Sequence, residues 1–179
     1  MEEKKQNVLL LIDANALVHR FFHALPPLTT PDGRPIQAIY GLAGVILKIF
    51  KEQKPDYIAA AFDRPEPTFR KEKFKEYKSH RPPTANELIS QIIEARRLFE
   101  IFGIKVFELP RFEADDIIGT LAETFKKEEG LKIIILSGDL DVLQLVDSNK
   151  VVAQIIKTGI TNVVMYDEEA VMQRYLLKP

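Results

Sequence analysis

The chain has 179 residues, of which 46% are hydrophobic and 28% are charged, so a wholly disordered chain is excluded. Its net charge of −1 excludes a broadly basic, histone-like nucleic-acid binder, and the lack of cysteine excludes disulfides, thiolate metal sites and a cysteine nucleophile. No run approaches the ~20 apolar residues of a transmembrane helix, and no signal peptide is recognisable. We therefore expect one cytoplasmic domain over residues 1–179.

Predicted strands and helices alternate along the chain. Short apolar runs, typical of strands buried on both faces of a sheet, stand at 8–12, 57–62, 104–107, 133–136 and 151–156. Apolar residues that recur every three or four positions predict helices at 37–53, 86–102, 114–129 and 168–177. Thr84 and Glu87 match a capping box, and Gly103 and Gly130 are expected to end helices. This order predicts an α/β fold with a mostly parallel central sheet and helices on both faces.

The segment 64–81 breaks this alternation. Its seven Lys and Arg residues outnumber its three Glu residues by four, so the rest of the chain carries a net charge of −5. Phe69, Phe74 and Tyr77 are interspersed among these charges. We interpret the segment as a mobile loop or a partly helical excursion, and expect it to be the most mobile internal part of the chain. Such a basic run is either a solvated surface or, beside an acidic metal site, a clamp for a nucleic-acid backbone.

Acidic residues gather where the predicted strands end. They are Asp13 after the first strand, Asp63 after the second, Glu113, Asp115 and Asp116 after the third, and Asp139 and Asp141 after the fourth. Because ligands of open α/β sheets bind beyond the carboxyl ends of the strands, we expect these carboxylates to share one cavity. Glu113 and Asp116 are three positions apart and can share a helix face, with Asp115 about 100° away from Asp116.

Seven carboxylates in one cavity need compensation. Two like charges ~4 Å apart repel by about 4 kcal/mol at an effective dielectric near 20, so either some carboxyls are protonated or divalent cations bind among them. Ligands that offer only oxygen suit Mg²⁺ or Mn²⁺, and two such ions can activate a water and stabilise the leaving oxygen of a phosphodiester. Any one acid alone could instead be a helix cap. His19 and His23 have a spacing found in zinc sites, but no third ligand is evident.

Four segments together resemble the flap endonuclease family of 5′ nucleases, which has a PIN-like fold and includes the domain at the start of bacterial DNA polymerase I. They are LLIDANALVHRFFHA, AFDRPEPTFRKEKFKEYKSHRPP, FEADDIIGTLA and SGDLDVLQLV. The resemblance implies that all seven acids bind metal, two ions of Mg²⁺ or Mn²⁺ in the complete domain, with catalytic roles for Asp13, Asp63 and Asp116. It also implies DNA contacts from Arg20, Arg70, Tyr77, Lys78 and Arg81, of which Lys78 and Arg81 are also catalytic. Residues of about 64–84 would form an arch through or under which a single-stranded 5′ end passes.

The resemblance further implies a divalent-metal-dependent 5′-3′ exonuclease and 5′-flap endonuclease in bacterial replication and repair, associated with the nucleoid. Its substrates would be DNA with 5′ flaps, nicks or single-stranded 5′ ends, and RNA primers, and a polymerase could follow in the same gene product. The family continues with a Gly-Asp-x-x-Asp-Asn motif and a helix-hairpin-helix that the 179 residues lack, so we expect a weakly active fragment. Ala14 and Leu140 replace the family's common Gly and Lys. The alternatives are a non-catalytic docking module that binds Mg²⁺ and nucleic acid, and a PIN-type ribonuclease.

Overall fold

The computed structural model describes residues 6–80, 82–158 and 162–179, which include a six-stranded sheet in the order β3-β2-β1-β4-β5-β6. The strands are β1 (Asn7–Asp13), β2 (Tyr57–Ala61), β3 (Lys105–Phe107), β4 (Leu131–Ser137), β5 (Val151–Thr158) and β6 (Asn162–Tyr166). All neighbours are parallel except β5 and β6, which are antiparallel. The five predicted strands are confirmed. Strand β6 was not among them, because it is a short edge strand in which Tyr166 alone is buried.

The predicted helices are confirmed, with different ends. The helices are α1 (Ala14–Ala24), α2 (Gln37–Lys48), π-helical η1 (Ile49–Gln53), α3 (Phe69–Lys73), α4 (Asn86–Ile101), α5 (Ala114–Phe125), 3₁₀-helical η2 (Asp141–Leu145) and α6 (Glu168–Tyr175). The predicted capping box of Thr84 and Glu87 is wrong, because Ala85 is the N-cap of α4 and no side chain caps it. Gly103 follows α4 with a φ of 69°, as expected for a helix stop, whereas α5 ends five residues before Gly130.

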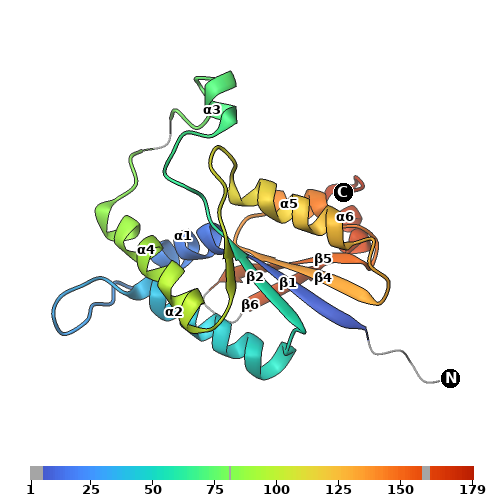
Figure 1. The fold of residues 1–179 in the computed structure, drawn as a ribbon, viewed down its shortest axis with the longest axis horizontal. Helices are drawn as coiled ribbons and strands as arrows, with labels where there is room; N and C mark the ends of the chain where they lie inside the picture. Colours follow the sequence, from blue (N-terminus) through green and yellow to red (C-terminus); the bar gives the residue numbers. More distant parts are fainter. Residues whose placement is uncertain (1–5, 81, 159–161) are drawn as a thin grey trace.

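Helices cover both faces of the sheet, which confirms the predicted architecture (Figure 1). Alternate residues of β1 divide the core: Leu10 and Ile12 pack with α1, α2 and α4, whereas Leu9 and Leu11 pack with α5 and the buried Val171 of α6. Strand β1 can supply both cores because it lies in the middle of the sheet, between β2 and β4. Within the described residues, no helix is both long and apolar enough to cross a membrane.

The arch, defined as residues 64–84, leaves the sheet after β2 and returns at the start of α4. It contains the short helix α3, so the expectation of a partly helical excursion is confirmed. Figure 1 shows α3 well clear of the sheet, above the end where β1 and β2 give way to the following loops. Because β1, β2 and β4 are parallel, their carboxyl ends meet at this same edge, and the arch stands over it.

Candidate active site

Six acidic side chains predicted to meet do line one cavity, of about 750 Å³, at the carboxyl edge of the sheet. They are Asp13, Asp63, Glu113, Asp115, Asp139 and Asp141. Asp13 ends β1, Asp63 lies just beyond β2, and Asp139 lies just beyond β4, so three neighbouring parallel strands deliver carboxylates to one place. The expectation of a shared acidic cavity is therefore confirmed for these six residues.

Asp13 is buried, with 3% of its surface exposed. Its Oδ1 accepts a hydrogen bond from the backbone N–H of Ala16 at 3.0 Å, which caps α1, and its Oδ2 accepts one from Ser137 Oγ at 2.7 Å. Burial raises the pKa of Asp13 to about 7, although both hydrogen bonds oppose the shift. Asp13 is therefore partly protonated near neutral pH unless a cation compensates its charge.

Asp63 joins the end of β2 to the start of α5. Its Oδ1 accepts a hydrogen bond from the N–H of Ala114 at 2.7 Å, and its carbonyl oxygen accepts one from Arg96 Nη2 at 2.9 Å. Asp115 follows in the first turn of α5 and remains exposed to solvent within the cavity. Partial burial of its carboxyl and repulsion from Asp63 and Asp139 raise the pKa of Asp115 to about 6. The cavity thus concentrates negative charge, as the sequence predicted.

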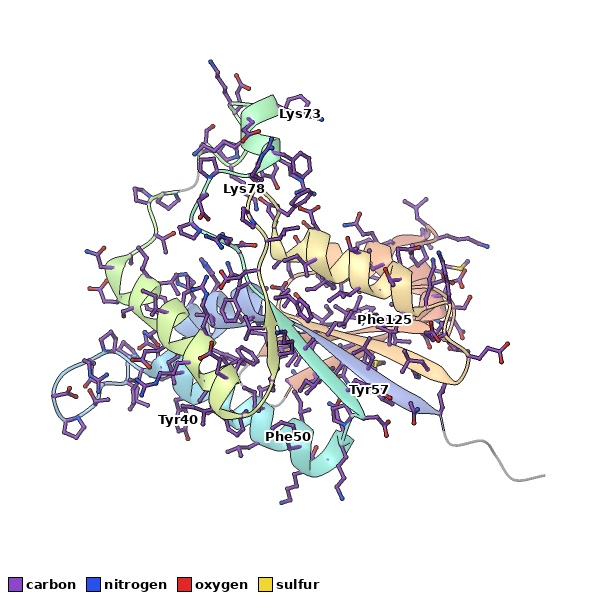
Figure 2. The ribbon with its side chains drawn as sticks, viewed as in Figure 1. Tyr40, Phe50, Tyr57, Lys73, Lys78 and Phe125 are labelled. Carbon is purple, nitrogen blue, oxygen red and sulfur yellow. The ribbon has the colours of Figure 1, made fainter. Side chains whose placement is uncertain are left out.

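Glu113 accepts two hydrogen bonds from the arch, and Arg70 Nη1 lies 3.5 Å from its Oε2. Lys78 Nζ donates a hydrogen bond to its Oε1 at 2.8 Å, and Tyr77 Oη donates one to its Oε2 at 3.0 Å. Burial opposes the charge of Lys78, but its hydrogen bond to Glu113 and the charge of that carboxylate raise the Lys78 pKa. Burial and the same carboxylate raise the pKa of Tyr77. Figure 2 shows Lys78 on the side of the arch nearer the sheet and Lys73 near its far tip.

Asp116 does not line the cavity, which corrects the expectation that it faces the same way as Glu113. Glu113 is the N-cap of α5 and has an extended backbone, with φ −90° and ψ 162°, so helical spacing does not relate the two side chains. Asp116 Oδ2 accepts a hydrogen bond from the N–H of Glu113 at 2.9 Å. The Asp116 carboxylate also forms a two-bond ion pair with Arg70, whose Nη1 and Nη2 lie 2.6 and 2.7 Å from its oxygens. This pairing lowers the pKa of Asp116 and raises that of Arg70.

The residues predicted to contact DNA divide into three groups. Arg20, Tyr77 and Lys78 line the cavity, Arg70 does not, and Arg81 lies outside the described residues. The stem of Arg20 crosses the loop after β4 at Gly138, where a Cβ atom would lie 3.0 Å from Arg20 Cδ and 3.0 Å from the carbonyl oxygen of Ala16. A glycine at position 138 is therefore what lets Arg20 reach the cavity wall.

Helix α1 adds cavity residues that sequence analysis missed as site residues. Asn15 lines the cavity, and its Oδ1 is buried with no hydrogen-bond partner among the described residues. Its position two residues after a strand-end aspartate, at the start of a helix, is the signal that could have found it. His19 and His23 also line the cavity, with ring centroids 6.4 Å apart, and His80 joins them from the arch.

The donor set suits a hard divalent cation, since it offers carboxylate oxygens and the unpartnered Asn15 Oδ1. A bound cation would also relieve the repulsion that raises the pKa of Asp115. As the side chains stand, no three acidic or histidine residues in the described part of the chain lie close enough to hold a metal ion. The metal-ligand roles of the seven acids therefore stay predictions, and binding would require the carboxylates to move closer together.

Comparisons with known proteins place the chain among 5′ nucleases. The DNA polymerase I of Caldicellulosiruptor bescii is 43% identical over 169 residues, and that of Bacillus subtilis is 41% identical over 179 residues. These matches cover 93% and 100% of this chain but 20% of each relative, so the chain spans about one fifth of their length. A 5′-3′ exonuclease of Aquifex aeolicus is 36% identical over 96% of this chain and 57% of its own.

Solved structures share the fold. A bacteriophage T5 flap endonuclease, solved with DNA and metal ions, matches with a TM-score of 0.69 and 20% identity over 96% of this chain and 61% of its own. The catalytic core of Rad2 in complex with DNA matches with a TM-score of 0.55 and 18% identity, over 97% of this chain and 51% of its own. The family described as "5′-3′ exonuclease, N-terminal resolvase-like domain" matches residues 8–176. The chain belongs to this 5′-3′ exonuclease family.

Proposed function

We propose that this chain is the nuclease part of a DNA polymerase I or of a stand-alone homologue. It is a divalent-metal-dependent 5′-3′ exonuclease and 5′-flap endonuclease that acts on DNA and on RNA primers in bacterial replication and repair, in the cytoplasm at the nucleoid. The observation that carries the proposal is the cavity at the sheet edge, which is lined by six predicted carboxylates, by Glu76 and by basic residues of α1 and of the arch. This combination fits a substrate that is itself an anion and needs cations to approach an acidic site.

Asp13, Asp63, Glu113, Asp115, Asp139 and Asp141 would hold Mg²⁺ or Mn²⁺, directly or through water, and Asp116 would support them from the first turn of α5. With two such ions bound in the complete domain, the site would gain an activated water and a stabilised leaving oxygen of the phosphodiester. The protein's own contribution is position: Asp63 is fixed by the N–H of Ala114, and Asp13 by Ser137 and α1.

The basic residues bind and orient the strand to be cut. Lys78 lines the cavity from the arch and Arg20 lines it from α1, so a strand bound in the cavity meets a cation from each of these two elements. Arg81, three residues after Lys78 in the arch, adds a further phosphate contact. Tyr77 is placed beside Lys78, where its ring can stack on an unpaired base. Substrates are DNA with 5′ flaps, nicks or single-stranded 5′ ends.

The test is cleavage of a DNA substrate that carries a labelled 5′ flap, with excess Mg²⁺, under single-turnover conditions. We expect cleavage that a chelator abolishes and that Asp63→Ala reduces by at least about 10³-fold. Because Asp63 also binds the N–H of Ala114, Asp63→Asn serves as the variant that keeps an acceptor at Oδ1. Cleavage at the same rate in chelator would overturn the proposal.

A non-catalytic module that binds Mg²⁺ and nucleic acid is the second candidate. It is favoured by the ion pairs that Arg70 and Lys78 make with Asp116 and Glu113, because these pairs leave fewer free carboxylates for a second ion. The same assay separates the two functions: a docking module binds the flap in Mg²⁺ and leaves it intact, whereas the nuclease cuts it. An all-RNA substrate tests the PIN-type ribonuclease, against which the basic arch argues.

A further inference from the structure

The foot of the arch, which is Phe69 and Arg70 at the start of α3, is fastened to α5 through Arg70. Its guanidinium pairs with Asp116 and also lies 3.5 Å from Oε2 of Glu113, the N-cap of α5. Arg70 donates two hydrogen bonds to Asp116, at 2.6 and 2.7 Å, in a geometry that uses both oxygens of the carboxylate. Asp116 Oδ2 also accepts the N–H of Glu113 at 2.9 Å, so the same carboxylate closes the first turn of α5. The Arg70 side chain is 31% exposed and that of Asp116 is 21% exposed, so solvent weakens the pair only in part.

Neighbouring contacts fasten the same foot. The N–H of Phe69 donates to the carbonyl oxygen of Arg111 at 2.9 Å, and the rings of Phe69 and Phe112 have centroids 5.5 Å apart. The Arg70 guanidinium lies 4.8 Å from the centroid of the Phe69 ring, which confines it further. Helix α3 is thus docked on the loop that leads into α5, although α3 itself buries no residue.

A continuous path of hydrogen bonds leads from this foot to the cavity. The Arg70 carbonyl accepts the N–H of Phe74 at 2.8 Å, and the Phe74 carbonyl accepts the N–H of Tyr77 at 3.0 Å. Tyr77 then donates its hydroxyl to Glu113, whose own N–H is bound by Asp116. The path therefore closes on itself, from Asp116 through Arg70 and the arch to Glu113 and back to Asp116.

Arg70 is poorly placed to bind a phosphate. It does not line the cavity, and to release it for a phosphate would leave the Asp116 carboxylate unpaired beside Glu113 and Asp115. Removal of one partner of such a pair is costly, since the remaining charge loses its compensation. Lys78, by contrast, lines the cavity and has a single carboxylate partner.

We infer, on the basis of the proposed function, that Arg70 is a positioning residue: its pair with Asp116 clasps the arch to α5 and so sets the place of Tyr77 and Lys78 over the cavity. It does not act as a phosphate ligand. Its removal should loosen the arch and weaken DNA binding without removing an ionic contact to the strand.

The first test measures amide hydrogen exchange of Phe69, Phe74 and Tyr77 in the absence of DNA and metal. We expect Arg70→Ala and Asp116→Ala each to speed exchange at these amides by about tenfold or more, because each removes the pair of Arg70 with Asp116. The double variant should add little to Arg70→Ala, which also removes the longer contact of Arg70 with Glu113. Arg64→Ala is the matched control: Arg64 is an arginine of the same arch that pairs with Glu66 within the arch. It also interacts with the charge of Glu108, but among the described residues it makes no hydrogen bond or ion pair with α5.

The second test measures the salt dependence of binding to a 5′-flap DNA in chelator. Arg70→Ala should weaken binding with the slope of log K against log salt concentration unchanged, whereas a lost phosphate contact would reduce the slope by about 0.9. If an alanine variant unfolds, both measurements are made instead on Arg70→Lys and Asp116→Asn, which preserve side-chain size. Unchanged exchange in Arg70→Ala, or a slope reduced by about 0.9, would overturn the inference. Neither test measures cleavage, so the role of the Arg70–Asp116 pair can be tested even if the chain has no nuclease activity.

Discussion

Lys78 donates its hydrogen bond to Glu113, so the arch places a fixed cation on one of the carboxylates proposed to bind metal. The two partners are drawn from segments 35 residues apart, and Glu113 exposes only 6% of its surface. A metal ion that enters the cavity therefore meets an ammonium group already in place. Lys78 and the proposed metal ion therefore compete for Glu113 when no substrate is bound, whereas both would contact a bound substrate.

This competition predicts that Lys78→Met binds Mn²⁺ more tightly than the unaltered chain, by roughly tenfold, because a second cation ~4 Å away in water-like surroundings costs about 1–2 kcal/mol. The measurement is a titration followed by electron paramagnetic resonance, without DNA. Lys73→Met is the control, since Lys73 is an exposed lysine of the same arch that does not line the cavity. Equal or weaker affinity in Lys78→Met would show that the ammonium group does not hinder the metal.

Burial of Asp13 predicts a stability that depends on pH. Burial raises its pKa from an ordinary value of 3.8 to about 7, so the folded state retains a proton that the unfolded state has lost. The protonated Asp13 carboxyl adds about 4 kcal/mol at most to the free energy of unfolding. This contribution is fully present below pH 3.8 and is lost as the pH rises through 7. In chelator at pH 8, Asp13→Asn should therefore be more stable than the unaltered chain.

Thermal unfolding measures this gain, which we expect to be of the order of 5–10 °C in melting temperature at pH 8 and to vanish near pH 4. Asp32→Asn is the control, because Asp32 is exposed and its pKa is lowered by hydrogen bonds from Thr30 and Arg34. A loss of stability in Asp13→Asn at pH 8 would mean that the charged form is better compensated than its burial indicates.

The close approach of Gly138 to Arg20 predicts that a substitution at this uncharged residue weakens DNA binding. Gly138→Ala places a Cβ atom 3.0 Å from Arg20 Cδ and should displace the Arg20 side chain from the cavity. We expect weaker flap binding and a salt slope reduced by about 0.9, as for Arg20→Ala. Gly119→Ala is the matched control: its Cβ would meet nothing closer than 3.5 Å, and it should be neutral or slightly stabilising within helix α5.

The phosphate contacts proposed for Lys78 and Arg81 predict a loss of affinity that is independent of sequence. Replacement of both by alanine should reduce the salt slope by about 1–2, because each contact contributes about 0.9. Binding of flaps with different sequences should fall by the same factor. If the salt slope of the double variant equals that of the unaltered chain, neither Lys78 nor Arg81 contacts a phosphate.

The sequence predicted the acidic cavity because its signal is topological: carboxyl ends of parallel strands share an edge, and Asp13, Asp63 and Asp139 each follow a strand. The prediction failed for Asp116 because it assumed that Glu113 was helical. An N-cap has extended backbone, and a residue three positions later then points elsewhere. The pairing of Arg70 with Asp116 joins residues 46 positions apart and depends on how the arch docks, which no local pattern encodes.

The central place of β1 has a consequence for how the domain forms. Strand β1 pairs with β2 and with β4, which follow it in the chain, and Asp13 reaches its hydrogen-bond partner Ser137 across 124 positions of chain. Until β4 has been synthesised, the apolar residues Leu9–Ile12 lack one neighbouring strand in the sheet. Their unpaired edge is then prone to aggregate with other chains. The cavity is therefore completed only after β4 has been synthesised, and a chain stalled before residue 131 lacks both Ser137 and the cavity residue Asp139.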